Sequence, residues 1–269
     1  MTSSAKSNET RSPARPQASS TLPSQIFAGT SGWAYPTWKP EFYPAGTSPK
    51  KFLEFYASQL NSVEVNYTFR SLPSASMLAG WLAAVPQQFR FSFKAPQRIT
   101  HFSRLQNCED AVAAFVDALD PVRAAGKLGV LLFQLPPNFK AAQDTLAQFL
   151  NVPALSGPDA PPLAFEFRHE SWFTEATYAT LRDHNAALCI AESEDLFTPE
   201  IHCAATHTCF RLRRPGGYTA EEISALAARF LQLAQSRQVY VYFKHEDDPT
   251  GALNAVSFLH EVAVGAGKR

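Results

Sequence analysis

Phe89-Arg90-Phe91-Ser92-Phe93-Lys94 carries the clearest strand signal in this sequence. Three phenylalanines alternate with an arginine, a serine and a lysine, which is the side-chain period of a β-strand with one apolar and one polar face. Other short runs, rich in β-branched or aromatic residues and bounded by turn residues, have the same character. They cover residues 26–30, 62–66, 130–135, 163–168, 187–192, 209–213 and 239–244. With residues 89–94 they give eight predicted strands.

Helical patterns lie between these runs. We expect helices over residues 48–60, 74–85, 108–125, 141–150, 173–184, 221–235 and 252–262, and a weaker one over residues 198–205. Strict alternation of strand and helix indicates a parallel sheet, and eight such units predict a single α/β domain over residues 25–265, a closed (β/α)8 TIM barrel. The alternative is an open doubly wound sheet. Against it, residues 29–33 (GTSGW) lack the G-x-G-x-x-G spacing of a dinucleotide-binding loop.

Composition excludes several classes of protein. Residues 1–24 are rich in Ser, Thr, Pro and basic residues, and we interpret them as a disordered leader. The formal net charge is zero, so a global field that attracts nucleic acid is not expected. No apolar run is long enough for a membrane span, and no cofactor motif is found. The cysteines, which have no metal-binding spacing, are interpreted as free thiols of a cytoplasmic protein. They are Cys108, Cys189, Cys203 and Cys209.

Polar side chains on the predicted strands should line the barrel interior, because the apolar faces are needed against the helices. Those at the carboxyl ends of strands face the mouth, where barrel active sites lie. They are Asn66, Lys94, Gln134, Arg168, Glu192, Arg213 and Lys244, with Glu64, Glu166 and Arg211 one layer deeper. Cations outnumber carboxylates in this set. We therefore expect the unpaired cations to contact either a bound anion or solvent. The alternative is an internal ion-pair network that joins Glu166 to Arg168 or Arg211, and Glu64 to Lys94.

The loop after the seventh predicted strand has the features of an anion site. Thr219 and Glu222 form a capping box that marks a helix start. Gly216, Gly217 and Tyr218 directly precede it, so backbone N–H groups at a helix N-terminus can approach a ligand. The alternative is an ordinary solvated turn.

Aromatic and histidine side chains also follow predicted strands. Trp33, Tyr35 and Trp172 could stack on a ligand ring at the mouth, or could simply pack the long loops. His101 and His245 are candidate acid–base groups, because an unperturbed histidine titrates near neutral pH. Each could equally be a capping or turn residue. Consecutive acidic residues after His245 more often cap a helix than hold a metal, so we predict no metal site.

The motifs, taken in order along the chain, resemble those of the YecE-like family, domain of unknown function 72. The resemblance rests on GTSGW (29–33) with Phe42-Tyr43-Pro44, VEVN (63–66) with TFR (68–70), FKAP (93–96) with ITH (99–101), QLPP (134–137), FEFR (165–168) with SWF (171–173), and Asn254-Ala255. It implies a TIM barrel and no established activity. It also implies a fold likeness to endonuclease-IV-like enzymes, on which nucleic-acid binding has been suggested by analogy alone.

The chain departs from the commonest pattern of that family at two strand ends. Many members carry Arg-Leu-His-Gly where this chain has Arg211-Leu212-Arg213-Arg214, and paired asparagines where it has Lys244 and His245. Both changes make the expected mouth more cationic. They also put in doubt any mechanism that depends on the replaced residues.

Three functions remain open at this point, and the residues leave undecided whether the chain is an enzyme. The first is a hydrolase or lyase that acts on a sugar phosphate, a nucleotide or a similar small anion, with Glu64 and Glu166 as an acid–base pair. The second is a nucleic-acid-binding protein, related in fold to endonuclease IV, whose partner would be a single strand. The third is a ligand-binding module without turnover.

Overall fold

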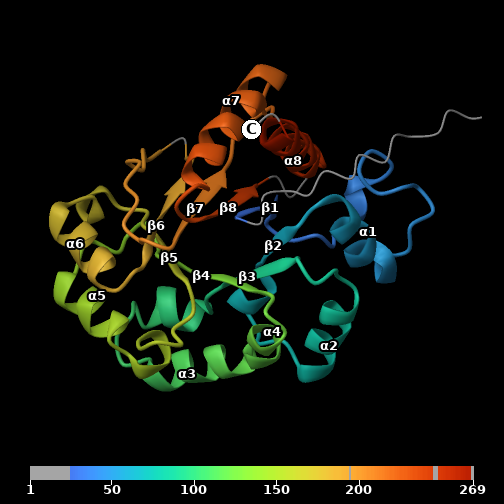
Figure 1. The fold of residues 1–269 in the computed structure, drawn as a ribbon. Helices are drawn as coiled ribbons and strands as arrows, with labels where there is room; N and C mark the ends of the chain where they lie inside the picture. Colours follow the sequence, from blue (N-terminus) through green and yellow to red (C-terminus); the bar gives the residue numbers. More distant parts are fainter. Residues whose placement is uncertain (1–24, 194, 245–247, 268–269) are drawn as a thin grey trace, which may run out of the picture.

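The computed structural model describes residues 25–193, 195–244 and 248–267. The leader that we expected over residues 1–24, and the candidate residue His245, lie outside this part of the chain. Parallel strands form the centre, and helices surround them (Figure 1). The strands are β1 (Ile26–Thr30), β2 (Ser62–Val65), β3 (Arg90–Lys94), β4 (Leu128–Gln134), β5 (Leu163–Glu166), β6 (Ala187–Ala191), β7 (His207–Leu212) and β8 (Gln238–Phe243).

The strands form an eight-stranded sheet in the order β1-β8-β7-β6-β5-β4-β3-β2, and every pair in it is parallel. A bridge between Ser31 and Glu64 brings the ends β1 and β2 together, so the sheet is a nearly closed barrel. The predicted (β/α)8 fold is therefore confirmed. The predicted strands also agree with the observed ones to within two residues at each end.

Side chains complete the seam between β1 and β2. The Asn61 amide accepts a hydrogen bond from the Ala28 N–H at 2.8 Å and donates one to the Ile26 carbonyl at 2.8 Å. The Tyr56 hydroxyl accepts from the Thr30 N–H at 2.8 Å and donates to the Ser62 carbonyl at 2.9 Å. These side chains satisfy backbone groups that a regular ladder would otherwise pair.

The outer layer consists of α1 (Phe52–Gln59), α2 (Ala75–Ala83), α3 (Glu109–Ala118), α4 (Asp120–Ala124), α5 (Gln143–Leu150), α6 (Glu175–Asp183), α7 (Ala220–Leu233) and α8 (Thr250–Gly267). Short helical turns stand at several loops: η1 (Pro36–Trp38), η2 (Pro49–Lys51), η3 (Tyr67–Phe69), η4 (Arg98–Phe102), η5 (Pro153–Leu155) and η6 (Glu170–Trp172). The predicted capping box of Thr219 and Glu222 opens α7, and Ser74 caps α2 as its position suggests.

The helix that we expected over residues 198–205 is absent, and this prediction was wrong. The described residues between β6 and β7 form an irregular segment instead. Barely two turns of residues with modest helix propensity do not sustain a helix on their own. The segment is held by packing, because Cys203 and Ala204 are buried.

Alternation along the strands divides the interior into two sets of buried side chains. Phe91, Phe93 and Phe165 belong to the large apolar cluster between sheet and helices. A smaller cluster, which includes Tyr242, fills the lumen below the mouth. The Tyr242 hydroxyl bonds Ser92 Oγ at 2.6 Å. The lumen is thus a packed core with a cation of β3 at each end, Lys94 at the mouth and Arg90 at the other end, where its guanidinium lies 5.1 Å from the centre of the Phe27 ring.

Candidate functional site

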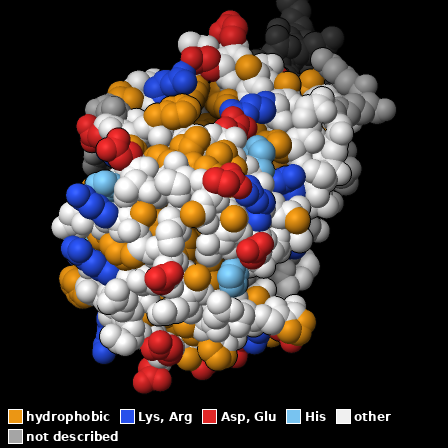
Figure 2. Space-filling view, turned by 90° about the vertical axis from the view of Figure 1, so that its left-hand side faces the viewer, with side chains coloured by type: hydrophobic (Ala, Val, Ile, Leu, Met, Phe, Trp, Pro, Cys, Tyr) orange, Lys and Arg blue, Asp and Glu red, His pale blue; other side chains and the backbone are white. Residues whose placement is uncertain are grey.

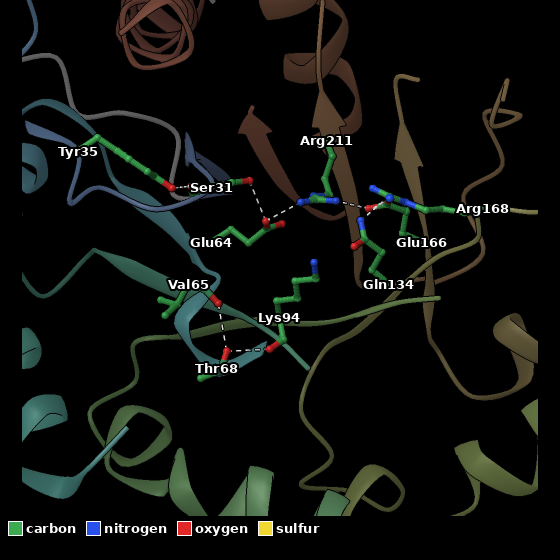
Figure 3. A network of polar contacts seen from close by, with 10 residues as sticks. All are labelled: Ser31, Tyr35, Glu64, Val65, Thr68, Lys94, Gln134, Glu166, Arg168 and Arg211. Carbon is green, nitrogen blue, oxygen red and sulfur yellow. Dashed lines mark hydrogen bonds and ion pairs between the residues drawn. The ribbon is translucent and has the colours of Figure 1, made fainter. Parts of the chain in front are cut away.

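Arg211, on β7, is the centre of the charged layer at the top of the lumen. Its side chain is buried, and its guanidinium joins carboxylates from two other strands (Figure 3). One terminal nitrogen lies 2.9 Å from Glu64 Oε1 on β2, and the other pairs with Glu166 Oε2 on β5. Attraction in this buried site raises the pKa of Arg211 further, although burial alone would lower it. The arginine is therefore a permanent cation that two carboxylates share.

Glu166 is the most fully bonded acid of this layer. Its Oε1 accepts hydrogen bonds from Gln134 Nε2 at 2.7 Å and from Arg168 Nε at 2.9 Å. Burial alone would raise the pKa of Glu166, but Arg211 and Arg168 outweigh it and lower the pKa to about 2. A carboxyl group that stays ionised at neutral pH is a poor proton donor. The geometry thus gives Glu166 the role of an anchor for two arginines.

Glu64 has one oxygen bonded and one free. Oε1 accepts from Ser31 Oγ at 2.8 Å and from Arg211, whereas Oε2 is buried without a hydrogen-bond partner among the described residues. The side chain has 0% exposure. An unsatisfied buried carboxylate oxygen is costly, and a ligand or a water molecule that donates to it would remove that cost.

Lys94 ends β3 and extends its ammonium toward the same layer (Figure 3). The alternative of a Glu64–Lys94 ion pair is not what the structure shows, because Glu64 pairs with Arg211. Among the described residues no carboxylate lies within ion-pair distance of Lys94 Nζ, which sits 4.1 Å from the centre of the Phe69 ring. Burial, followed by repulsion from Arg211, lowers the pKa of Lys94 to about 8.

Two further candidates lie at this end of the barrel. Burial, and then the charges of Lys94 and Arg168, lower the pKa of His101, which favours its neutral form. Its Nδ1 lies 2.9 Å from Thr100 Oγ1. Asn66 follows β2, and its Oδ1 is buried without a partner among the described residues.

A pocket of about 210 Å³ opens beside this layer. It brings together four of the predicted basic residues, Arg168, Arg211, Arg213 and Lys244, with acids that include Glu166 and Glu192. Arg168 keeps 42% of its side chain exposed while it bonds Glu166. Arg213 is exposed and has no ion pair with any described residue.

The loop after β7 already holds carboxylates of the chain itself. Glu192 Oε2 accepts from the Arg213 N–H at 2.8 Å and from the Tyr218 hydroxyl. Glu222 accepts from the Thr219 N–H at 2.9 Å and pairs with Arg214. The Arg213 and Thr219 N–H groups, the Tyr218 hydroxyl and the Arg214 guanidinium are thus engaged by carboxylates of the chain itself.

Gly216 and Gly217 shape that loop. They have φ angles of 78° and 81°, which favour glycine, and the Gly217 N–H closes a turn on the Arg214 carbonyl at 3.0 Å. In this structure the two glycines therefore serve the turn.

The three predicted aromatic residues differ in their burial and in their packing partners. Trp172 is fully buried, stacks on Phe167 and donates to the Phe139 carbonyl at 2.7 Å, so it presents no ring face to a ligand. Trp33 packs edge-on against Trp81. Tyr35 bonds the Ser31 carbonyl at 2.9 Å and packs on Trp38. Trp172 thus serves loop packing, whereas Trp33 and Tyr35 pack in the loop and stay partly exposed.

Sequence reasoning missed two exposed phenylalanines at the mouth. Phe102, in the turn after β3, is 73% exposed, and Phe197, in the loop after β6, is 83% exposed. Neither sits in an amphipathic pattern, so the only sequence signal was their position after predicted strands. It also missed Ser31, the hydrogen-bond donor to Glu64.

In the part of the chain that the structure describes, no cluster of three or more His, Cys, Asp and Glu side chains has an arrangement that could hold a metal ion. No helix there is long and apolar enough to cross a membrane. The four cysteines are buried free thiols.

These features define a (β/α)8-barrel protein with a buried arginine–carboxylate layer beneath a basic mouth. The model of the family described as "Protein of unknown function DUF72" matches residues 27–268, and the chain belongs to this family. The resemblance that the sequence motifs indicate is thereby confirmed.

Curated relatives and solved structures agree with this assignment. The chain is similar to UPF0759 protein YunF of Bacillus subtilis, with 31% identity over 57% of the chain and 54% of the relative. It is similar to UPF0759 protein YecE of Escherichia coli, with 31% identity over 56% of the chain and 51% of the relative. The matched part spans about half the length of these curated relatives.

Among solved structures, a DUF72 family protein from Thermotoga maritima has a TM-score of 0.73 and 26% identity, over 87% of this chain and 97% of that one. One from Enterococcus faecalis has a TM-score of 0.70 and 19% identity, over 88% and 95%, and shows the common fold.

Proposed function

We propose that the barrel mouth binds a small anionic metabolite, such as a sugar phosphate or a nucleotide. The observation that supports this is the pocket of about 210 Å³ lined by Arg168, Arg211, Arg213 and Lys244. Its volume lies below the roughly 300–1,000 Å³ of sites for drug-sized ligands, which favours a ligand of few atoms. Arginine matches carboxylate and phosphate oxygens in a bidentate geometry.

The cations of the pocket differ in how many of their hydrogen-bond donors already have a partner. Arg211 pairs with Glu64 and Glu166 through its terminal nitrogens, and its Nε is buried without a hydrogen-bond partner among the described residues, so it contributes mainly its charge to the pocket. Arg213 has no ion pair within the described residues, and Arg168 bonds Glu166 through Nε alone, which leaves its terminal nitrogens for a ligand. We therefore assign direct contact with the anion to Arg168 and Arg213.

If turnover follows binding, a hydrolase or lyase mechanism would use Glu64 rather than a Glu64/Glu166 pair. Glu166 is held ionised by its arginines, whereas Glu64 keeps a free oxygen within the layer. The same geometry serves a binding module without turnover, and a product assay on any ligand that binds separates the two.

A thermal-shift titration tests the proposal. Dihydroxyacetone phosphate and inorganic phosphate should stabilise the protein, by about 2.7 kcal/mol at a hundredfold excess over Kd, whereas neutral dihydroxyacetone should not. Arg213→Ala should weaken binding roughly 10- to 100-fold, the effect of losing one charged hydrogen-bond partner. Arg98→Ala is the matched control, because Arg98 is exposed in η4 and does not line the pocket. Equal loss in both variants would contradict a specific site.

A single-stranded nucleic acid is the second candidate, and the exposed rings favour it. Phe102, Phe197 and Tyr67 project from loops after three different strands, with exposures of 73%, 83% and 47%. Exposed aromatic rings beside basic groups can stack on bases. Oligo(dT) belongs in the same titration. Binding that Phe197→Ala weakens and that falls steeply with salt would favour this candidate over the small metabolite.

A further inference from the structure

Lys94 differs from the other inward-facing cations in its surroundings. Arg211 takes up the carboxylates of both Glu64 and Glu166, so the Lys94 amine has no acid of the described residues at ion-pair distance. In Figure 3 its Nζ points into the space between Glu64 and Gln134. The ring of Phe69 closes one side at 4.1 Å. The amine is therefore held in place without a counter-ion.

Lys127 shows what a buried structural lysine looks like in this fold. Its Nζ donates to the carbonyl oxygens of Val85 at 2.9 Å and Pro86 at 2.7 Å. The Lys94 amine has no such acceptors among the described residues. The Lys94 side chain is only half-buried, so its donors are left to a ligand or to solvent.

Burial favours the neutral form of Lys94, and the charges around it act in both directions. Burial is the largest cause that lowers its pKa, to about 8, and the cations of Arg211 and Lys244 act in the same direction. The carboxylates of Glu64 and Glu166 oppose them. A neutral amine has a lone pair and is a nucleophile toward carbonyl carbon.

Glu64 supplies a proton acceptor in the same layer. Its Oε2 is fully buried and has no hydrogen-bond partner among the described residues. It comes from β2, the neighbour of the strand that carries Lys94. An uncommitted acceptor beside an uncommitted amine is an arrangement suited to proton transfer during addition to a carbonyl group.

We propose that Lys94 forms an imine with a small carbonyl compound that also carries an anionic group, such as a 2-oxo acid or a phosphorylated ketone. The proposal rests on the proposed function, because Arg168 and Arg213 would hold the anionic group. The Nζ lone pair attacks the carbonyl carbon, and the π electrons of the C=O bond move to oxygen, which takes a proton. Glu64 Oε2 accepts the proton that nitrogen loses and returns it to the hydroxyl group. The C–O bond then breaks, water leaves, and a C=N bond forms. One neutral amine, one carbonyl group and one proton, which the carbonyl oxygen took from solvent, thus give one iminium ion and one water molecule.

Borohydride trapping with peptide mapping tests this step. The whole chain is incubated with pyruvate or with dihydroxyacetone phosphate, then reduced, digested and analysed by mass spectrometry. A lysine with a pKa near 8 has roughly a hundredfold more neutral amine at neutral pH than an ordinary lysine. We expect the reduced adduct at Lys94 to exceed that at the exposed Lys140 at least about tenfold. Adducts spread over exposed lysines without an excess at Lys94, or no adduct from either probe, would overturn the proposal.

Two variants serve as matched controls. Lys94→Arg keeps the positive charge but cannot form the imine, so it should abolish the specific adduct, whereas Lys140→Arg should leave it unchanged. If Lys94→Arg does not fold, the peptide map of the unmodified chain alone tests the proposal. A specific adduct that persists in folded Lys94→Arg overturns the proposal.

The experiment also separates this proposal from the anion site. Stabilisation by inorganic phosphate without any adduct at Lys94 would retain the anion site and reject the imine. An adduct at Lys94 that forms equally with neutral dihydroxyacetone, with no stabilisation by phosphate, would retain the imine and reject the anion site.

Discussion

Arg211 determines which charges at the barrel mouth remain available to a ligand. The sequence indicates an excess of cations over carboxylates, and the structure shows how it is divided. Glu64 and Glu166 both turn to Arg211, which comes from a third strand. Arg168 shares Glu166 with Arg211, and Lys94 and Arg213 have no ion pair among the described residues.

Removing Arg211 should destabilise the fold strongly. Arg211→Met leaves two buried carboxylates without their cation, and breaking a buried pair in this way costs about 3–5 kcal/mol. Urea unfolding followed by circular dichroism measures the loss. Arg213→Met, two residues further along but exposed, should change the free energy of unfolding by no more than about 0.5 kcal/mol. If Arg211→Met loses no more stability than Arg213→Met, the buried ion pairs contribute nothing measurable to the free energy of unfolding.

At the scale of elements, the seam between β1 and β2 shows how this barrel closes. Gly29 allows the close approach, because a Cβ there would lie 1.8 Å from the Ser62 carbonyl oxygen. Tyr56, from α1, then reaches between the strands and bonds the backbone of both. A helix side chain thus takes the place of ladder hydrogen bonds.

Tyr56→Phe should reveal the contribution of this seam. The ring would remain packed, but the buried Thr30 N–H and Ser62 C=O would lose their shared partner, at a cost of about 1–3 kcal/mol. Thermal and urea unfolding give the value. Tyr67→Phe is the control, because Tyr67 is 47% exposed and its hydroxyl has no hydrogen bond with the described residues. Hydrogen exchange at the Thr30 amide should accelerate only in the Tyr56 variant, and unchanged protection there would argue against the seam.

The sequence predicts the elements far better than their contacts. Alternation in FRFSFK identifies a strand and the face of Lys94, because side-chain period is a local property. It cannot tell that Glu64 meets Arg211 rather than Lys94, since that depends on strand pairing across the lumen. The expected helix over residues 198–205 failed for a related reason, because burial of Cys203 by distant elements overrides a weak local preference.

For the candidate site, too, the sequence predicts positions along the chain better than contacts in space. Position after a strand identified Lys94, Arg168 and Arg213 as mouth residues. In the structure Arg168 and Arg213 line the pocket, and Lys94 points toward the charged layer beside it. The same signal also selected Trp172, which is buried, because sequence position does not reveal on which side of a loop a large ring packs. Glu192 illustrates a further limit, since its role inside the β7 loop requires the fold of that loop.

For the molecule as a whole, positive and negative side chains are equal in number, whereas Lys94 at the barrel mouth has no described carboxylate at ion-pair distance. The formal net charge is zero, and the face shown in Figure 2 carries acidic and basic side chains interspersed. A long-range field that would gather polyanions is therefore weak, and attraction must come from the mouth itself. This contrast favours a small ligand that enters the pocket over a long polymer on the surface.

An internal charge without a counter-ion should cost the whole molecule stability, in a manner that depends on pH. The pKa of Lys94 is lowered to about 8, so the folded state binds fewer protons than the unfolded state between pH 8 and the usual lysine range. Stability therefore rises with pH across this window, and the cost is present in full below it. Lys94→Met should make the protein more stable than the unmodified chain at pH 7.

The difference between Lys94→Met and the unmodified chain should shrink as the pH rises from about 8 toward 10, where the folded unmodified chain carries a neutral amine. Urea unfolding of both proteins at several pH values measures it, and Lys140→Met, at an exposed site, should show no such trend. Comparison of paired variants cancels the titration of tyrosines, which affects each protein alike. If the gain of Lys94→Met stays constant from pH 7 to 10, the relief of packing strain, rather than the removal of a confined charge, explains the gain. If the gain in the free energy of unfolding shrinks as expected, the charged amine of Lys94 destabilises the fold. Such a loss of stability is typical of a residue retained for binding or chemistry.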